Sequence, residues 1–310
     1  MVFENFHPAS ERWFITQFKQ PTKTQIDAWQ AIQNRKHTLV SAPTGSGKTL
    51  AAFYVAIDRL VKRGSSESKN NLLPGGIQTG NMMHELFEHL DFGMIRKSSS
   101  PQNWLEQTLV REQIKKIRVR YQRSEETVPV IAEIIWNTLH TPVSLGTDLD
   151  SEQIELSSCK QNLREPDFYF PIPSKGTFES KDLEVLKKEA ELKLYDWNVD
   201  KGFLRGSIDF VFEHKDRIYL IDWKSNTLED YHPKTLENEV IKHYMLQLQI
   251  YTLATSYWFN LDSKEKFEKR FGGVLYIFLR GMLQREGVFF FRPVWNDLLD
   301  YENILSLEKY

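Results

Sequence analysis

The sequence holds a single cysteine, Cys159, among 310 residues. One thiol cannot form a disulfide within the chain, and it cannot supply the four thiolates of an iron–sulfur cluster. No run of 18 apolar residues occurs, so the sequence predicts no membrane-spanning helix. The first residues, MVFENFHPASERW, carry charges and a proline where a signal peptide has an apolar segment. We therefore expect a cytoplasmic protein.

The chain also lacks an excess of positive charge. It has 40 Lys and Arg against 42 Asp and Glu, a net charge of −2. Binding to a nucleic acid would therefore depend on a local cluster of cations and not on the overall field. One such cluster is REQIKKIRVRYQR at 111–123. It is typical of a DNA-facing helix and equally of a solvated surface that faces a protein partner, and composition does not separate the two.

By composition the chain divides into a short and a long piece. Residues 1–64 are rich in helix-forming runs, and SSESKNN at 65–71 has the composition of a linker. From residue 72 onward, amphipathic segments alternate with strand-like runs. The sequence therefore predicts a domain at 1–64, a linker at 65–71 and a second domain at 72–310.

The short piece contains a phosphate-binding motif. In TLVSAPTGSGKTLAAF, a strand-like run at Thr38–Val40 leads into a glycine-rich loop, and a helix-forming run follows from Leu50. In a Walker A loop, backbone amides surround the phosphates, the lysine neutralises their oxygens and the hydroxyl residue holds Mg²⁺. The sequence thus predicts an ATP site. Its candidate residues in the loop are Gly45, Ser46, Gly47, Lys48 and Thr49.

These residues resemble the opening of a helicase. PTKTQ, which ends at Gln25, is similar to the adenine-reading Q-motif of superfamily-2 helicases, and the run through the Walker A loop resembles DEAD/DEAH-type, Lhr-like helicases. A working motor also needs a Walker B acidic strand and a second lobe that carries an arginine finger. No DExD/H string follows, so we interpret residues 1–64 as a truncated helicase fragment. We expect neither ATPase nor helicase activity from this chain alone.

The run IYLIDWKSN at 218–226 places charges in an apolar strand pattern. Because strand side chains alternate, Asp222 and Lys224 share a face with Ile218 and Leu220. An unpaired charge on a buried face is costly, so either the strand emerges into solvent there or the site needs both charges.

The preceding run, FLRGSIDFVF at 203–212, predicts the other strand of a hairpin, with Asp209 on it and the polar turn EHKDR after it. Carboxylates on adjacent strands repel each other unless a cation lies between them, and Mg²⁺ or Mn²⁺ prefers such oxygen ligands. Lys224 would then stabilise charge on a phosphate or activate water. An Asp followed by Asp-x-Lys is the pattern of PD-(D/E)xK nucleases.

Five blocks extend that resemblance: LPGGIQTGNMMHELFEHLDF, REPDFYFPI, GFLRGSIDFVFEHKDRIYLIDWKSN, YMLQLQIYTLA and FGGVLYIFLRGM. They resemble, in order, the C-terminal nuclease domain of RecB, the beta subunit of exodeoxyribonuclease V, over residues 72–290. The resemblance implies a restriction-endonuclease-like α/β fold, a mixed sheet flanked by helices. It also implies Mg²⁺-dependent hydrolysis of single- or double-stranded DNA and RecC- and RecD-like partner subunits.

The resemblance also implies roles for particular residues. The metal ligands would be His84, Asp209, Asp222 and the backbone carbonyl of Trp223. A tryptophan stands at 223 where the family often has tyrosine, which should matter little because the carbonyl is the ligand. The catalytic residues would be Asp209, Asp222, Lys224, Gln247 and Tyr251, the last two reaching one phosphodiester from one helix face.

Taken singly, these residues have plainer interpretations. His84 lies beside the apolar stripe of Met83, Phe87 and Leu90, where it is typical of a helix surface. Asp209 alone fits a surface carboxylate near a turn, and Tyr251 alone fits a core aromatic. Two other functions also stay open: an ATP-binding helicase subunit, and an inactive fusion remnant that binds only DNA or a partner.

Overall fold

The computed structural model describes residues 3, 6–33, 38–41, 47–147, 151–171, 197–200 and 203–306. The chain forms two compact units, an N-terminal unit of Met1–Leu72 and a C-terminal unit of Leu73–Tyr310. None of the described helices is both long enough and apolar enough to cross a bilayer.

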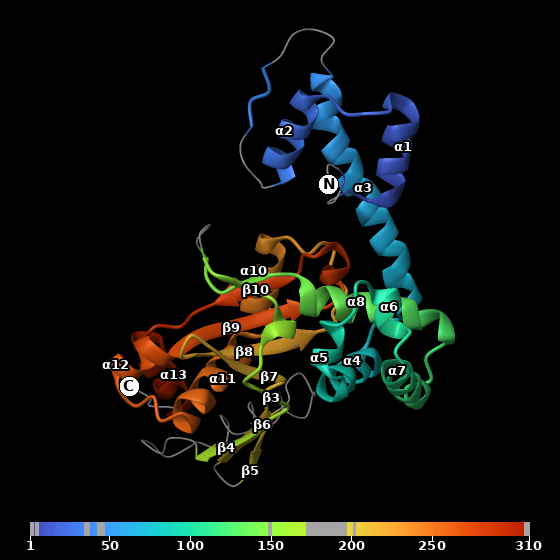
Figure 1. Ribbon diagram of the computed structural model, residues 1–310. Helices are drawn as coiled ribbons and strands as arrows, with labels where there is room; N and C mark the ends of the chain where they lie inside the picture. The colour runs from blue at the N-terminus through green and yellow to red at the C-terminus, as the bar shows by residue number, and fades with distance from the viewer. Residues whose placement is uncertain are drawn as a thin grey trace. The chain divides into compact units, whose positions relative to one another are not determined.

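The N-terminal unit consists, in its described part, of three helices, α1 (Pro8–Phe18), α2 (Lys23–Gln33) and α3 (Lys48–Leu72) (Figure 1). They enclose a small aromatic core around Phe14, Trp29 and Tyr54. The rings of Trp29 and Tyr54 lie 4.9 Å apart, and the Trp29 indole donates a hydrogen bond to the carbonyl of Ala51. Packing of aromatic rings at this spacing stabilises a unit too small for a large aliphatic core.

Two expectations for this unit differ from the structure. Residues 38–41, which include the predicted strand Thr38–Val40, are not in a strand, and Leu39 is 95% exposed. A strand needs a hydrogen-bonding partner, and the described residues of this unit form only helices. Residues 65–71, predicted as a linker, continue helix α3 as far as Leu72.

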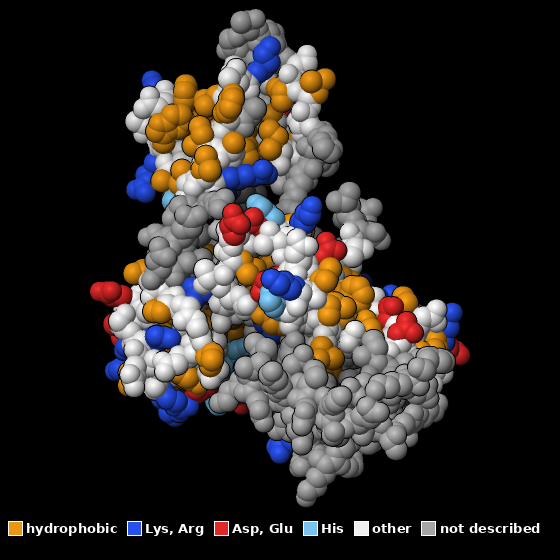
Figure 2. All heavy atoms as spheres, turned by 180° about the vertical axis from the view of Figure 1, so that it is seen from behind, with side chains coloured by type: hydrophobic (Ala, Val, Ile, Leu, Met, Phe, Trp, Pro, Cys, Tyr) orange, Lys and Arg blue, Asp and Glu red, His pale blue; other side chains and the backbone are white. Residues whose placement is uncertain are grey.

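Several apolar side chains of the N-terminal unit lie on its surface. In helix α3, Phe53, Ile57 and Leu60 recur at helical spacing and are all exposed, whereas Tyr54 is buried. The space-filling view shows hydrophobic side chains gathered on the displayed face of this unit (Figure 2). An exposed apolar face of this kind is typical of a helix that packs against another element.

The C-terminal unit contains both helices and strands. Its helices are α4 (Ile77–His89), α5 (Phe92–Ile95), α6 (Pro101–Leu105), α7 (Thr108–Arg120), α8 (Val128–His140), α10 (Pro233–His243), α11 (Met245–Trp258), α12 (Lys264–Arg270) and α13 (Trp295–Ser306). Its strands are β1 (Val143–Ser144), β2 (Gln153–Ile154), β3 (Asn162–Arg164), β4 (Asp167–Pro171), β5 (Trp197–Asp200), β6 (Phe203–Ser207), β7 (Phe210–His214), β8 (Arg217–Lys224), β9 (Phe271–Phe278) and β10 (Val288–Phe291). Short 3₁₀ turns lie at Glu125–Thr127, Leu156–Ser158 and Gly281–Gln284.

A five-stranded mixed sheet lies at the centre of this unit, in the order β10-β9-β8-β7-β3 (Figure 1). Strands β8 and β9 run parallel, and the other neighbours are antiparallel. Strands β4, β6 and β5 form a second, three-stranded sheet. The prediction of an α/β fold with a mixed sheet flanked by helices is confirmed.

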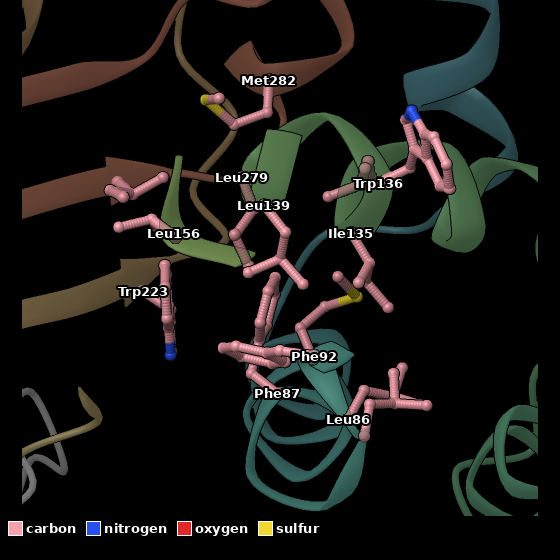
Figure 3. Packing of buried hydrophobic residues seen from close by; sticks show 14 of the residues in the cluster. Leu86, Phe87, Phe92, Ile135, Trp136, Leu139, Leu156, Trp223, Leu279 and Met282 are labelled. Carbon is pink, nitrogen blue, oxygen red and sulfur yellow. The ribbon is translucent and has the colours of Figure 1, made fainter. Parts of the chain in front are cut away.

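The two faces of strand β8 belong to different cores, as its alternation predicts. Tyr219, Ile221 and Trp223 pack in one cluster with helices α4 to α8. Figure 3 shows residues of this cluster from distant parts of the chain, among them Phe87 of α4, Leu139 of α8 and Trp223 of β8. On the opposite face, Ile218 and Leu220 pack with helices α10 to α13. Asp222 and Lys224 continue this second face.

Asp209 is not on a strand, which corrects the predicted hairpin. The run at 203–212 is divided between two sheets: β6 belongs to the three-stranded sheet and β7 to the five-stranded sheet, with Ile208 and Asp209 in the bend between them. The hairpin itself forms one residue later, where Phe210 pairs with Ile221. Continuing that register places Asp209 beside Asp222, so the change of sheet keeps the two carboxylates adjacent.

Candidate metal and phosphodiester site

Helix α4 brings His84 to the end of strand β8. Met83 and Phe87 on the same helix are buried, and the Phe87 ring stacks on Trp223 with centroids 4.5 Å apart. This packing fixes the helix against the strand. As a result, Nε2 of His84 lies 3.0 Å from the carbonyl oxygen of Trp223, and Nδ1 lies 3.3 Å from Oδ1 of Asp209.

Asp209 is buried, so its interpretation as a surface carboxylate is wrong. Its Oδ2 accepts a hydrogen bond from the amide of Trp223 at 2.6 Å. Its Oδ1 is buried and accepts no hydrogen bond from the described residues. A buried carboxylate oxygen needs a positive neighbour: the His84 ring, with Nδ1 3.3 Å away, supplies one when it is protonated, and a bound cation would supply one otherwise.

Glu165 joins this cluster and was not singled out from the sequence. It lies between β3 and β4 with φ of +47°, and its amide donates to the carbonyl of Asp209 at 3.0 Å. Its Oε1 lies 3.7 Å from Nδ1 of His84. One ligand atom each of His84, Glu165 and Asp209 lies within 4.8 Å of the others. The available signal was the block REPDFYFPI, which contains Glu165, but the pairing that brings it beside Asp209 needs the fold.

Asp222 lies outside that three-residue group and has its own partners. Its Oδ2 lies 2.6 Å from Nζ of Lys224, and its Oδ1 accepts a hydrogen bond from Nε2 of Gln247 at 2.8 Å. The Gln247 Oε1 in turn accepts a hydrogen bond from Lys224 at 3.0 Å. One amide therefore holds both members of the ion pair. Asp222 as a metal ligand stays a prediction.

Gln247 and Tyr251 share a face of helix α11, as their spacing predicts, and both are fully buried. Nε2 of Gln247 also donates to the Tyr251 hydroxyl at 2.9 Å. Lys224 lies over the ring of Tyr244, with Nζ 4.1 Å from the centroid. This arrangement orients the ammonium by hydrogen bonds and by a cation–π contact. Contact of Gln247 and Tyr251 with a phosphodiester stays a prediction.

The electrostatics of the site favour bound positive charge. Burial opposes the charged His84 ring, but Asp209 and Glu165 outweigh it and raise the pKa of His84 well above its ordinary value. Burial raises the pKa of Asp222 to about 7, although the Lys224 ammonium acts in the opposite direction. Burial also disfavours the Lys224 ammonium, but Asp222 outweighs it and raises the pKa of Lys224. Perturbed groups gathered in one place are typical of functional sites.

The predicted nucleotide site lies where helix α3 begins. Lys48 and Thr49 are its first residues, and Gly47 precedes them with φ of +79°. Gln25, predicted to read adenine, is buried, and its amide accepts a hydrogen bond from the Thr22 amide and donates to the carbonyl of Gly47. Gly45 and Ser46 lie outside the described residues.

Residues 22–90 match the DEAD/DEAH box helicase family. The match continues beyond Leu72, so it includes helix α4 of the C-terminal unit. Over 64 residues, 21% of this chain, the sequence is 50% identical to the Lhr helicase/uracil glycosylase of Escherichia coli K12, of which it covers 4%.

A longer similarity is to RecB. The chain is 31% identical over 240 residues to the RecBCD enzyme subunit RecB of Haemophilus influenzae, and 32% identical over 232 residues to RecB of Escherichia coli K12. These alignments cover 74% and 71% of this chain. The chain spans only 18% of the length of either relative. Since 240 residues far exceed the N-terminal unit, most of this similarity lies in the C-terminal unit.

The cationic segment at 111–123 forms most of helix α7. Val110, Ile114 and Ile117 of this helix are buried, and Lys115 and Lys116 are exposed. The segment is thus amphipathic, with its apolar stripe on the core and Lys115 and Lys116 outward, whereas the side chain of Arg118 is only 12% exposed and pairs with Glu125. Both of its proposed uses, DNA contact and partner contact, stay open.

Proposed function

We propose that the C-terminal unit is a metal-dependent deoxyribonuclease that hydrolyses phosphodiester bonds in DNA. The observation that carries this proposal is the convergence of His84, Glu165 and Asp209, with ligand atoms within 4.8 Å, beside the buried Asp222–Lys224 pair. An imidazole and carboxylates that can bind Mg²⁺ or Mn²⁺, beside an ammonium that can neutralise a phosphate, are the groups that a metal-dependent phosphodiesterase needs. The similarity to RecB supports the same assignment.

The chain's residues fit a divalent cation at this place. The buried Oδ1 of Asp209 accepts no hydrogen bond from the described residues, and it points to the same region as the Glu165 carboxylate and the His84 ring. We propose His84, Asp209, Asp222 and the carbonyl of Trp223 as ligands, with Glu165 added. The bound ion would supply Lewis acidity toward a phosphate oxygen and a water molecule. Because imidazole suits Mn²⁺ better than Mg²⁺, we expect both ions to support the reaction.

Lys224 is the residue that would meet the phosphate. Its side chain is 11% exposed, and its raised pKa keeps it charged at neutral pH. Gln247 and Asp222 hold Nζ at the end of β8. A fixed ammonium in a largely buried site would neutralise the charge that develops on the phosphate as water attacks phosphorus and the bond to the deoxyribose oxygen breaks, with the attacking water losing a proton and the leaving oxygen gaining one. Asp222 and Gln247 thus orient the amine.

The test is cleavage of linear single- and double-stranded DNA by the purified chain with Mg²⁺ or Mn²⁺. We expect Asp209→Asn and Lys224→Met to lower the rate by about 100-fold or more, since each removes a charge at the reacting centre. Lys215→Met is the matched control, because Lys215 lies in the exposed β7–β8 turn and pairs with Glu152. Equal rates for the wild type, Asp209→Asn and Lys224→Met would overturn the proposal.

We further propose a role in DNA recombination and double-strand break repair with RecC- and RecD-like subunits, supported by the similarity to a RecBCD subunit. The alternatives make different predictions. A helicase subunit would show DNA-stimulated ATP hydrolysis that Lys48→Ala abolishes. An inactive remnant would bind DNA and cleave it with neither metal. Copurification with RecC- and RecD-like proteins would support the proposed partners.

A further inference from the structure

Arg280 is a buried cation at the end of strand β9, with only 2% of its surface exposed. Its guanidinium donates hydrogen bonds to three backbone carbonyls. Nε bonds to Ser225 at 2.9 Å, Nη1 to Leu73 at 2.9 Å and Nη2 to Pro74 at 3.1 Å. Burying a guanidinium costs free energy unless its donors find acceptors. Here the acceptors belong to segments more than 50 residues away in the sequence, so Arg280 connects distant parts of the chain.

The three acceptors lie next to two elements that carry the candidate site, two before the start of helix α4 and one after the end of strand β8. Leu73 and Pro74 lead into helix α4, which bears His84. Ser225 directly follows Lys224, whose own carbonyl accepts a hydrogen bond from the Leu279 amide at 2.8 Å. Arg280 therefore joins the start of helix α4, which carries His84, to the end of strand β8, which carries Lys224.

The joint between these elements is tightly packed. A Cβ on Gly80 of helix α4 would lie 3.1 Å from Oγ of Ser225, so the helix approaches residue 225 closely. The turn before α4 is also held from its other side, because Thr79 donates to the carbonyl of Pro74 and accepts from Nη2 of Arg123 at 2.8 Å. Small movements of the turn would be transmitted to the helix.

Arg280 itself has a fixed base. Leu279 and Met282 on either side of it are buried in the cluster that contains Trp223 and Phe87 (Figure 3). Gly281 has no room for a side chain, since a Cβ there would lie 2.7 Å from the Tyr231 ring. The guanidinium is planar, and the backbone that carries it is held by buried neighbours. A lysine has all its donors on a single nitrogen, so it cannot make the same three hydrogen bonds.

We propose that Arg280 is a positioning residue for the metal site: it sets His84 at its distance from Asp209 and the Trp223 carbonyl by tying helix α4 to the end of strand β8. The role of Arg280 in metal binding rests on the proposed nuclease function. Its link between helix α4 and strand β8 rests on the hydrogen bonds alone. Residues that orient metal ligands typically change metal affinity by about 10- to 100-fold when they are altered.

The experiment compares Arg280→Lys with Arg292→Lys in the full chain. Arg292 lies beyond β10 and also donates to backbone carbonyls, those of Phe271 and Glu268, at the opposite end of strand β9. It therefore reports the general effect of losing such bonds from the same sheet. Leu139→Ala, a buried residue of the same cluster as Leu279, controls for loss of stability. All variants are measured at a temperature where circular dichroism shows them folded.

Two readouts are taken without DNA. The first is Mn²⁺ affinity, measured by calorimetry. We expect Arg280→Lys to weaken Mn²⁺ binding about 10-fold or more relative to the wild type. We expect the affinity of both controls to stay within about twofold of the wild-type value. The second is amide hydrogen exchange in the metal-free chain, where Arg280→Lys should accelerate exchange in residues 77–84 and 223–226 and Arg292→Lys should not.

The outcomes separate the two proposals. Arg280→Lys with the Mn²⁺ affinity and exchange pattern of Arg292→Lys would overturn the positioning role. Weaker Mn²⁺ binding in Leu139→Ala of the same size would also overturn it, because the effect would then follow stability alone. A wild-type chain that binds no Mn²⁺ would refute the metal site, and the exchange pattern would still decide whether Arg280 links helix α4 to strand β8.

Discussion

Replacement of Gln247 by leucine tests the polar network behind the candidate site. Gln247 is fully buried, and its amide bonds to Asp222, Lys224 and the Tyr251 hydroxyl. Leucine fills nearly the same volume without a polar atom, so the variant removes the bonds and leaves their partners buried. Hydrogen bonds to charged groups contribute about 1.5–3 kcal/mol each. Because the Asp222–Lys224 ion pair remains, we take the lower value for each charged partner and expect a loss of about 3 kcal/mol.

Urea denaturation measures this loss as a shift of the midpoint. With a slope of about 2 kcal/mol per molar, the midpoint should fall by about 1.5 M. Thr252→Val on the same helix is the control, since Thr252 is also fully buried and, among the residues that the structure describes, its hydroxyl bonds to the Leu248 carbonyl one turn earlier and to no charged group. We expect the control to lose about 1 kcal/mol or less. A midpoint for Gln247→Leu no lower than that of Thr252→Val would refute the reasoning.

Three further predictions follow from local geometry. Trp223→Tyr should keep the cleavage rate, because the proposed ligand is a backbone carbonyl, whereas Trp223→Ala should lose about 3–5 kcal/mol of stability to urea. Gly47→Ala should destabilise the N-terminal unit by about 1–2 kcal/mol, because Gly47 has a φ of +79° and a Cβ there would lie 2.4 Å from Nε2 of Gln25. The loss should appear as faster hydrogen exchange in α1 and α2. Gly75→Ala is the control and should change little. Burial raises the pKa of Cys159 to about 12, so at pH 8 its alkylation should be about 1,000-fold slower than that of an ordinary thiol, until guanidinium unfolds the chain.

The alternation of strand β8 was predictable from the sequence because it depends only on the period of a strand. Tyr219, Ile221 and Trp223 occupy one core, and Ile218 and Leu220 the other, as the pattern requires. The α/β class followed from the same kind of local information. Such patterns specify which face a side chain occupies without specifying what it meets there.

The parts that were missed depend on pairing between distant segments. Glu165 reaches the site only because its amide pairs with the carbonyl of Asp209, which no local pattern of residues 162–171 indicates. Asp209 was expected on a strand, but the chain changes sheets at that residue. The expected strand at 38–40 has high strand propensity but no neighbour among the described residues, and propensity alone does not form a sheet.

The question raised by IYLIDWKSN, why an apolar strand ends in two charges, has an answer in the balance of energies. A buried ion pair contributes little to folding, and apolar residues of similar size are often at least as stabilising. Yet here the fold supplies the pair with an amide that bonds to both members and an aromatic ring under the ammonium, and the strand register places Asp222 beside Asp209. Folding alone would favour leucines at the end of this strand. The network is therefore better explained by the chemistry it positions than by the stability it adds.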